Sequence, residues 1–531
     1  YFLGGRDATW LAIGASIFAS NIGSEHLIGL AGAGASSGMA MAHWEIQGWM
    51  ILILGWVFVP FYTRSMVYTM PEFLERRYNP QSRTILSVIS LVSYVLTKVA
   101  VTVYAGGLVF QQVFGIKELW GIDFFWIAAI GLVVLTALYT IFGGMKSVLY
   151  TSVLQTPILL LGSLIILVLG FKELGGWDEM MRVCGAVTVN DYGDTMTNLI
   201  RSNDDANFPW LGALIGSAII GFWYWCTDQF IVQRVLSGKN EMEARRGTIF
   251  GAYLKLLPVF LFLIPGMIAF ALHQKYIGAG GEGFLPMLAN GTANADAAFP
   301  TLVAKLLPAG VKGLVVCGIL AALMSSLASL FNSSAMLFTI DFYKRFRPET
   351  PEKKLVGIGQ VATVVIVILG ILWIPIMRSV GDVLYTYLQD VQSVLAPGIA
   401  AAFLLGICWK RTSAQGGMWG LIAGMVIGLT RLGAKVYYSN AGEVADSTFK
   451  YLFYDMNWLF FCGWMFLFCI IVVIVVSLAT KAPTAEKIQG LVFGTATKEQ
   501  KAATRASWNH WDIIHTVIIL AITGAFYWYF W

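Results

Sequence analysis

Long apolar segments follow one another along the whole chain, with short polar loops between them. Each run approaches or exceeds the ~20 residues that an α-helix needs to cross the hydrocarbon core of a bilayer. The segments lie at 10–34, 44–62, 84–114, 122–142, 148–170, 209–234, 247–272, 309–343, 356–378, 382–407, 414–437, 457–480 and 512–531. This pattern predicts an all-α polytopic membrane protein with thirteen spans.

The composition agrees with that class, because 57% of the residues are hydrophobic and only 12% are charged. A soluble chain of this size could not keep so much apolar surface from water. The net charge of +5 resides in short loops, so it is a signal of topology and predicts no nucleic-acid partner. No phosphate-binding loop, nucleophile–base set or metal-ligand spacing occurs, so we expect neither an enzyme nor an organic cofactor.

Basic residues concentrate in alternate loops. They are Arg64, Arg76, Arg77, Arg83, Lys146, Arg234, Lys239, Arg245, Arg246, Lys344, Arg345, Arg347, Lys410 and Arg411. Alternation of thirteen helices puts them all on one side, which the positive-inside rule makes cytoplasmic. The acidic loop 171–208 falls outside, 481–511 is a cytoplasmic loop, and 512–531 is the final transmembrane helix. We expect a multi-pass protein of the plasma membrane, or of the inner membrane if the source is bacterial.

Polar side chains interrupt five of the predicted spans. The stretch "SNIGSEHLIGLAGAG" (20–34) carries Asn21, His26 and several glycines between apolar flanks. A charged group at bilayer depth costs about 2.5–3.5 kcal/mol, so it normally faces a cavity or a partner. Each such residue, taken alone, could serve helix–helix hydrogen bonding. Five spans that contribute amide, carboxylate, ammonium and indole groups together favour a polar cavity.

This set of side chains suits a polyhydroxylated solute. A sugar or polyol needs donors and acceptors around its rim and an aromatic face against its C–H surface. The expected solute-binding residues are Asn21, His26, Glu45, Lys255 and Gln389, with Tyr224 and Trp225 as the aromatic faces.

A second string, "LAALMSSLASLFNSS", places Ala322, Ser325 and Ser326 on one helix face. Taken alone, this string favours close helix packing. An unwound turn near 19–23 would change that interpretation, since it would free backbone carbonyls beside a cavity. Carbonyls of Ala19 and Ile22, set against the two serines, would then complete a neutral oxygen site for Na⁺.

The chain resembles the sodium/solute symporter family, in particular its sodium/glucose, sodium/galactose and sodium/myo-inositol members. The resemblance rests on "YFLGGR", "GASIFASNIGSEHLIGLAG", "VYTMPEFLERRY", "TALYTIFGG", "WYWCTDQFIVQR", "YLKLLPVFL", "FPTLVAKLLPAGVKGL", "ALMSSLASLFNSSAMLFTIDFY" and "FLLGICWKR". It implies a LeuT-like core within 1–480, with inverted five-helix repeats at about 10–170 and 209–407, a discontinuous first helix and peripheral C-terminal helices. It also implies the solute and sodium residues named above. Family members usually carry one more helix before "YFLGGR", so we expect a preceding helix in the full-length protein.

Three positions depart from the family pattern. Ser152 stands where relatives carry a carboxylate, Ala328 where two-sodium relatives carry threonine, and Gln392 where threonine is common. The first two remove oxygen ligands from a second sodium site, so the sequence predicts one Na⁺ per solute. The alternative is that Asp228 or Asp390 supplies the missing carboxylate from another helix.

The sequence therefore predicts a sodium-coupled symporter of a hexose or myo-inositol that works by alternating access in a lipid bilayer. Two alternatives stay open. One is a solute sensor or solute-gated ion channel on the same scaffold. The other is a symporter of a non-sugar solute.

Overall fold

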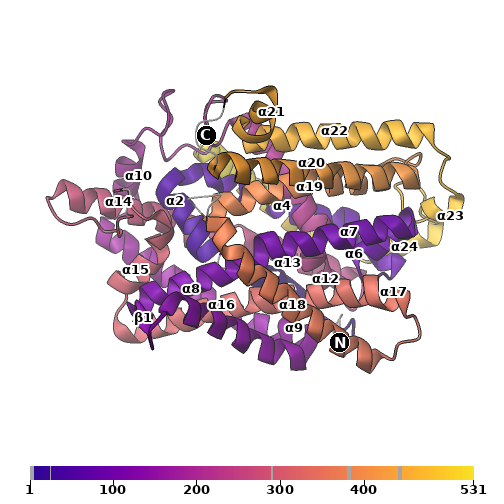
Figure 1. Cartoon of the computed structure of the whole chain (residues 1–531), viewed down its shortest axis with the longest axis horizontal. Coiled ribbons are helices and arrows are strands. Elements are labelled where there is room, and N and C mark those ends of the chain that lie inside the picture. Colours follow the sequence, from indigo (N-terminus) through magenta and orange to yellow (C-terminus); the bar gives the residue numbers. More distant parts are fainter. Residues whose placement is uncertain (1–4, 24, 289–290, 379–383, 441–444) are drawn as a thin grey trace.

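The computed structural model describes residues 5–23, 25–288, 291–378, 384–440 and 445–531. In this part of the chain, eleven helical segments are long and apolar enough to cross a membrane, and two shorter apolar helices cover 10–21 and 124–138. Together they fall on the thirteen predicted segments. The long helices run side by side as one bundle (Figure 1). The prediction of an all-α polytopic membrane protein is confirmed.

The first half of the chain forms these elements. They are α1 (Trp10–Asn21), η1 (Glu25–Leu30), α2 (Ala31–Ser37), η2 (Gly38–Met41), α3 (Ala42–Glu45), α4 (Gly48–Ile53), η3 (Leu54–Phe58), α5 (Val59–Ser65), α6 (Met70–Arg77), α7 (Pro80–Ser93), η4 (Tyr94–Val99), α8 (Ala100–Phe114), β1 (Glu118–Leu119), β2 (Ile122–Asp123), α9 (Phe124–Leu174), α10 (Trp177–Gly185), α11 (Trp210–Gly221), η5 (Phe222–Thr227), α12 (Gln229–Leu236) and α13 (Glu241–Lys255). The antiparallel pair of β1 and β2 is a small hairpin between helices.

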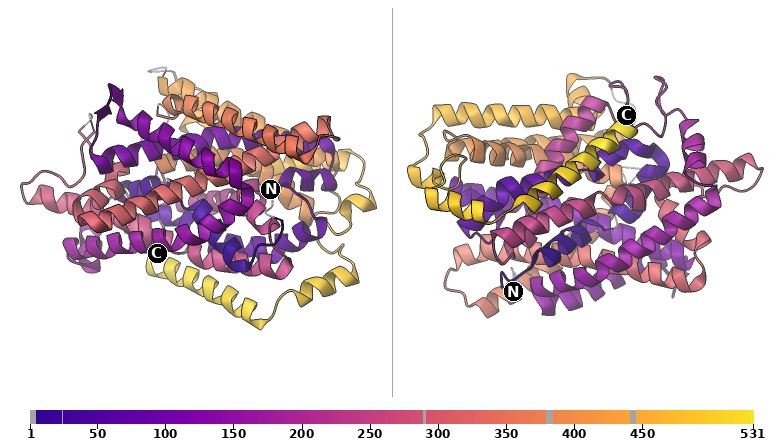
Figure 2. Two further views of the ribbon diagram at one scale, coloured as in Figure 1. Left: turned by 90° about the horizontal axis from the view of Figure 1, so that it is seen from below. Right: turned by 180° about the vertical axis from the view of Figure 1, so that it is seen from behind.

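The second half of the chain forms helices in the described residues. Its elements are η6 (Val259–Leu263), α14 (Ile264–Gly278), η7 (Ala295–Ala297), α15 (Ala298–Leu306), α16 (Ala309–Met336), η8 (Leu337–Tyr343), α17 (Lys344–Phe346), α18 (Glu352–Arg378), α19 (Leu384–Cys408), α20 (Ala414–Asn440), α21 (Thr448–Lys450), η9 (Tyr451–Asp455), α22 (Trp458–Ala479), α23 (Ala485–Ile488), α24 (Lys498–Ala506) and α25 (His510–Tyr529). Helices α20, α22 and α25 lie at the periphery of the bundle (Figure 2).

The elements next to the predicted basic loops and those next to the acidic loop 171–208 lie at opposite ends of the bundle. Helices α6, α17, α23 and α24 gather at one end, and β1, α10 and α15 gather at the other (Figure 1). The sequence predicted two spans where the structure has the single helical segment α9. Its neighbours β1 and α10 lie at the same end of the bundle, so α9 leads back to the end at which it starts. The turn was expected at 143–147, whose side chains lie outside the described part.

The first span is broken inside the bundle, as predicted. Helix α1 ends at Asn21, and Ile22 leaves the helical region with φ −80° and ψ 94°. Helical structure resumes at Glu25 as a π-helix and continues into α2. The Phe18 carbonyl still accepts from the Ile22 N–H at 2.8 Å, whereas the carbonyls that follow it lie at the break.

The sixth span has a second break, which the sequence analysis did not anticipate. Segment η5 ends at Thr227, and Asp228 has an extended backbone (φ −76°, ψ 127°) and caps α12 by accepting from the Phe230 N–H at 3.2 Å. The same carboxylate accepts from the Tyr94 hydroxyl at 2.6 Å and pairs with the Lys98 ammonium at 2.5 Å. The break is thus held by a buried charge and its counter-charge.

Close backbone contact between α2 and α14 stabilises the half of the first span beyond its break. A Cβ on Gly34 would overlap the Leu263 carbonyl, and a Cβ on Gly266 would overlap the Ala31 carbonyl. Each glycine thus allows one helix backbone to lie directly on the other, which is how transmembrane helices pack most tightly.

We predict that Gly266→Ala lowers stability by about 1–3 kcal/mol, because the added methyl group forces the α2 and α14 backbones apart. The control is Gly313→Ala on α16, where no atom lies within 4 Å of the added carbon. Thermal unfolding in detergent should show a clear drop in melting temperature for the first variant and none for the second. Equal melting temperatures would contradict the packing argument.

We also predict that Asp228→Asn destabilises the protein by about 3–5 kcal/mol, because it leaves the Lys98 ammonium buried without its counter-charge. The double variant Asp228→Asn/Lys98→Met removes both charges and should recover much of the lost melting temperature. If the single variant melts like the unaltered protein, the ion pair does not hold the second break.

Candidate solute and sodium sites

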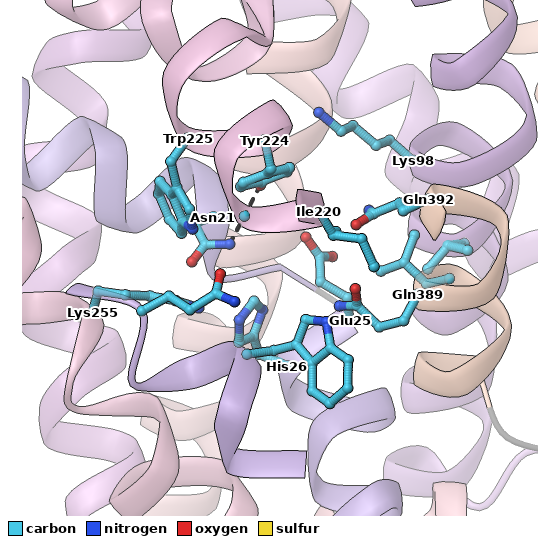
Figure 3. A pocket seen from close by; sticks show the side chains of 15 residues that line it. Asn21, Glu25, His26, Lys98, Ile220, Tyr224, Trp225, Lys255, Gln389 and Gln392 are labelled. Atoms are coloured by element: carbon cyan, nitrogen blue, oxygen red, sulfur yellow. Dashed lines mark hydrogen bonds between the residues drawn. The ribbon is translucent and has the colours of Figure 1, made fainter. Parts of the chain in front are cut away.

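Residues beside the two helix breaks line one cavity inside the bundle. Fifteen residues line it: Asn21, Glu25, His26, Trp44, Gln47, Lys98, Val101, Ile220, Gly221, Tyr224, Trp225, Lys255, Leu388, Gln389 and Gln392. They come from the first, second, third, sixth, seventh and tenth predicted spans, and their side chains surround one space (Figure 3). Six of the seven residues predicted to bind solute are among them.

The seventh, Glu45, does not line this cavity. Its side chain is fully buried, and one carboxylate oxygen lies 2.6 Å from the Lys255 Nζ and 3.1 Å from the His26 Nε2. Glu45 ends the short helix α3, Lys255 ends α13, and His26 follows the break in the first span. The geometry thus places Glu45 behind the wall, where it fixes the two basic side chains that face the cavity.

Two aromatic rings form one side of the cavity. Tyr224 and Trp225 lie on η5 with ring centroids 5.0 Å apart and planes at 83°. The Asn21 amide, at the end of α1, donates to the hydroxyl of Tyr224 on η5 at 3.3 Å, so the segments that end at the two breaks are hydrogen-bonded to each other (Figure 3). The Lys98 ammonium lies 4.8 Å from the Tyr224 ring centre, and the Lys255 ammonium 5.3 Å from that of Trp225. The rings therefore sit between the two buried cations.

Polar atoms on the cavity residues that have no hydrogen-bond partner among the described residues include the Asn21 Oδ1 and the Gln389 Oε1, both acceptors, and the Trp44 Nε1–H, a donor. All three are buried. An unsatisfied buried polar group costs about 1–3 kcal/mol, so such atoms mark where a ligand with hydroxyl groups would be accepted.

Sequence reasoning missed Lys98 as a cavity residue. The signal was present, since Lys98 is a lone ammonium in the apolar string "YVLTKVAV", and a charge at that depth normally has a partner or faces a cavity. What the string does not contain is the partner. Asp228 lies on another helix, 130 residues further along the chain.

The predicted sodium residues lie where the end of α1 packs on α16. Ala19, Ile22, Ala322, Ser325 and Ser326 are all buried. The Ser326 hydroxyl lies 3.3 Å from the Ser20 carbonyl oxygen, and the hydroxyls of Ser20 and Ser329 lie 2.7 Å apart. The carbonyl seen against Ser326 is therefore that of Ser20, between the two predicted carbonyls. Buried hydroxyl and carbonyl oxygens of this kind suit a hard cation.

The departures from the family pattern have different surroundings. The Ser152 side chain lies outside the described part, Ala328 is fully buried on α16, and Gln392 lines the cavity. The carboxylates that could substitute for the missing ligand are both engaged, since Asp228 pairs with Lys98 and Asp390 with Lys435.

Comparison with known proteins identifies the family. Residues 1–424 match the Sodium:solute symporter family. The chain is 37% identical over 508 residues to the sodium/myo-inositol cotransporter 2 of Homo sapiens, covering 93% of this chain and 74% of that protein. It is 39% identical over 499 residues to the sodium/glucose cotransporter 1 of Ovis aries, covering 91% and 74% of the two chains.

A solved structure of a Na⁺-coupled sialic acid symporter in a substrate-bound outward-open state superposes with a TM-score of 0.70. The identity is 22%, and the match covers 91% of this chain and 93% of that one. At that identity the likeness shows the fold, which is the LeuT-like arrangement. By its family match and its relatives, the chain belongs to the sodium:solute symporter family.

Proposed function

We propose that the protein is a sodium-coupled symporter that carries a sugar or polyol across the plasma membrane by alternating access. The observation that carries this proposal is the cavity, where amide oxygens and an indole N–H that lack hydrogen-bond partners among the described residues line the same space as the aromatic pair Tyr224 and Trp225. Polar groups for hydroxyls and a flat apolar surface for ring C–H groups are what such a solute requires. The named relatives, which are sodium/myo-inositol and sodium/glucose cotransporters, support the same solute class.

Within this proposal, Asn21 and Gln389 accept from solute hydroxyls and Trp44 donates to one. His26 and Lys255 bind further hydroxyls, and Glu45 positions both of them. Tyr224 and Trp225 pack against the solute ring. Glu45 acts through its two partners, which revises its predicted direct contact with solute.

The proposed sodium site explains how an ion and a solute could be coupled. Na⁺ would be held by carbonyls at the end of α1 and by Ser325 and Ser326 on α16. Asn21 is the last residue of α1 and also lines the solute cavity. An ion that orders this helix end would therefore also set the position of Asn21, so that sodium prepares the cavity for solute.

The magnitudes are adequate for transport against a gradient. One charge crossing a potential of 100 mV releases about 2.3 kcal/mol, and a tenfold Na⁺ gradient adds about 1.4 kcal/mol. A single Na⁺ can thus sustain a solute ratio of several hundredfold. One Na⁺ per solute also fits the engagement of Asp228 and Asp390 by lysines.

The inverted repeats at about 10–170 and 209–407 belong to the same proposal. The helix breaks at Ile22 and at Asp228 support it, because they fall in the first helix of each repeat. In such transporters, broken helices of this kind carry the ion and solute sites. The basic end of the bundle, with 481–511, would face the cytoplasm.

The first test is solute accumulation in proteoliposomes. With an imposed inward Na⁺ gradient, labelled glucose or myo-inositol should accumulate above its external concentration, and replacement of Na⁺ by choline should abolish accumulation. Reversal potentials under imposed gradients should give one Na⁺ per solute. Sodium-dependent current without accumulation would instead indicate a sensor or channel, and competition by neither glucose nor myo-inositol would defeat the sugar assignment.

The second test concerns the cavity wall. Gln389→Leu should weaken solute affinity roughly tenfold, because a hydroxyl would lose its acceptor while the side-chain volume is kept. Glu45→Gln should have a similar effect by releasing Lys255 and His26. The control is Gln489→Ala, an exposed position on the 481–511 segment. Solute titrations at saturating Na⁺ measure all three, and unchanged affinity in both cavity variants would refute the assignment.

A further inference from the structure

Glu25 is an acidic residue inside the first span, and it is not among the proposed solute or sodium ligands. It is the first residue of η1, directly after the break that follows α1. Its side chain is half-buried and lines the solute cavity. Figure 3 shows its carboxylate pointing among the other cavity side chains. A carboxylate is costly at this depth unless a nearby cation compensates it.

The same carboxylate also lies next to the proposed sodium site. The Glu25 Oε2 and the Ser326 hydroxyl oxygen are each 2.6 Å from the point that a Cβ on Gly23 would occupy. The two oxygens are therefore neighbours, and the absence of a side chain on Gly23 leaves the space between them open. Glu25 thus lies where the solute cavity and the proposed ion site adjoin.

The charges around this point favour a carboxylate beside a bound cation. The proposed ligands from α1 and α16 are neutral oxygens, and the Arg234 guanidinium is 3.2 Å from the Ser20 hydroxyl beside them. That guanidinium is fully buried, and it opposes entry of a second cation. Asp228 and Glu45 pair with Lys98 at 2.5 Å and with Lys255 at 2.6 Å. Glu25 is the acidic side chain whose carboxylate adjoins Ser326, so its negative charge is placed to offset a cation at the break.

We propose that Glu25 is part of the sodium site and supplies the negative charge that lets a largely dehydrated Na⁺ bind beside Ser326. This inference rests on the proposed function and extends it. Carboxylate oxygens are good ligands for hard cations, and their charge offsets the desolvation that neutral oxygens alone repay poorly. Because the same side chain lines the solute cavity, sodium binding would also hold it in place against the solute.

The test is sodium binding itself, measured without solute and without transport. Binding of radioactive Na⁺ to the purified full chain in detergent is followed by scintillation proximity, with choline keeping the ionic strength constant. Glu25→Gln keeps the size of the side chain and removes its charge, so it should raise the half-saturating Na⁺ concentration about tenfold or more. Glu179→Gln is the matched control, because Glu179 pairs with Arg182 on α10, outside the cavity.

The outcomes separate this inference from the proposed function. If the unaltered protein binds Na⁺ and Glu25→Gln binds it equally well, the inference is wrong, whatever happens to solute affinity, and the proposed function stands. If the unaltered protein binds no Na⁺, both are wrong. Should Glu25→Gln fail to fold, Glu25→Asp decides. It keeps the charge but withdraws it by one methylene, so a several-fold weaker Na⁺ affinity is expected, and an unchanged affinity would overturn the inference.

Discussion

The structure depends on an interrupted helix in a medium that does not tolerate interruptions. Backbone amides and carbonyls at bilayer depth must be satisfied inside the protein, so a break survives only where it lines a cavity or is buried against other groups. At Ile22 both conditions hold. The Ser20 carbonyl near the end of α1 accepts from the Ser326 hydroxyl of α16, and the Asn21 amide donates to the Tyr224 hydroxyl on the other broken span. The polar cavity follows from this arrangement, because segments next to both breaks line the same space.

Two buried ion pairs beside the cavity join side chains from different helices. Lys98 pairs with Asp228 across 130 residues of sequence, and Lys255 pairs with Glu45 across 210. A pair of this kind adds little net stability, because desolvation offsets most of the attraction, but loss of one partner is costly. Such pairs favour one arrangement of the helices over others. Because each ammonium group has a carboxylate partner, Lys98 and Lys255 can line the cavity without an uncompensated charge at bilayer depth.

The proposed ion and solute sites share a short stretch of chain rather than a long path of contacts. Asn21 ends α1, Gly23 leaves room for two oxygens, and Glu25 begins η1. An ion bound here would act directly on side chains that line the cavity. In this proposal, coupling needs only that Na⁺ favours one arrangement of that stretch, which is the differential affinity that any such coupling requires.

The sequence alone determined which segments cross the membrane, because bilayer thickness demands a run of apolar residues that is visible locally. It also determined the first break, since the glycines and Asn21 stand together within one span, and it singled out six side chains that do line the cavity. Tertiary structure decided the rest. Whether Glu45 lines the cavity or supports its wall depends on where Lys255 and His26 come to lie. The break at Asp228 and the inclusion of Lys98 depend on a contact between helices far apart in the chain. Local patterns determine depth in the bilayer, whereas the face that each helix presents to the cavity is set by packing against its neighbours.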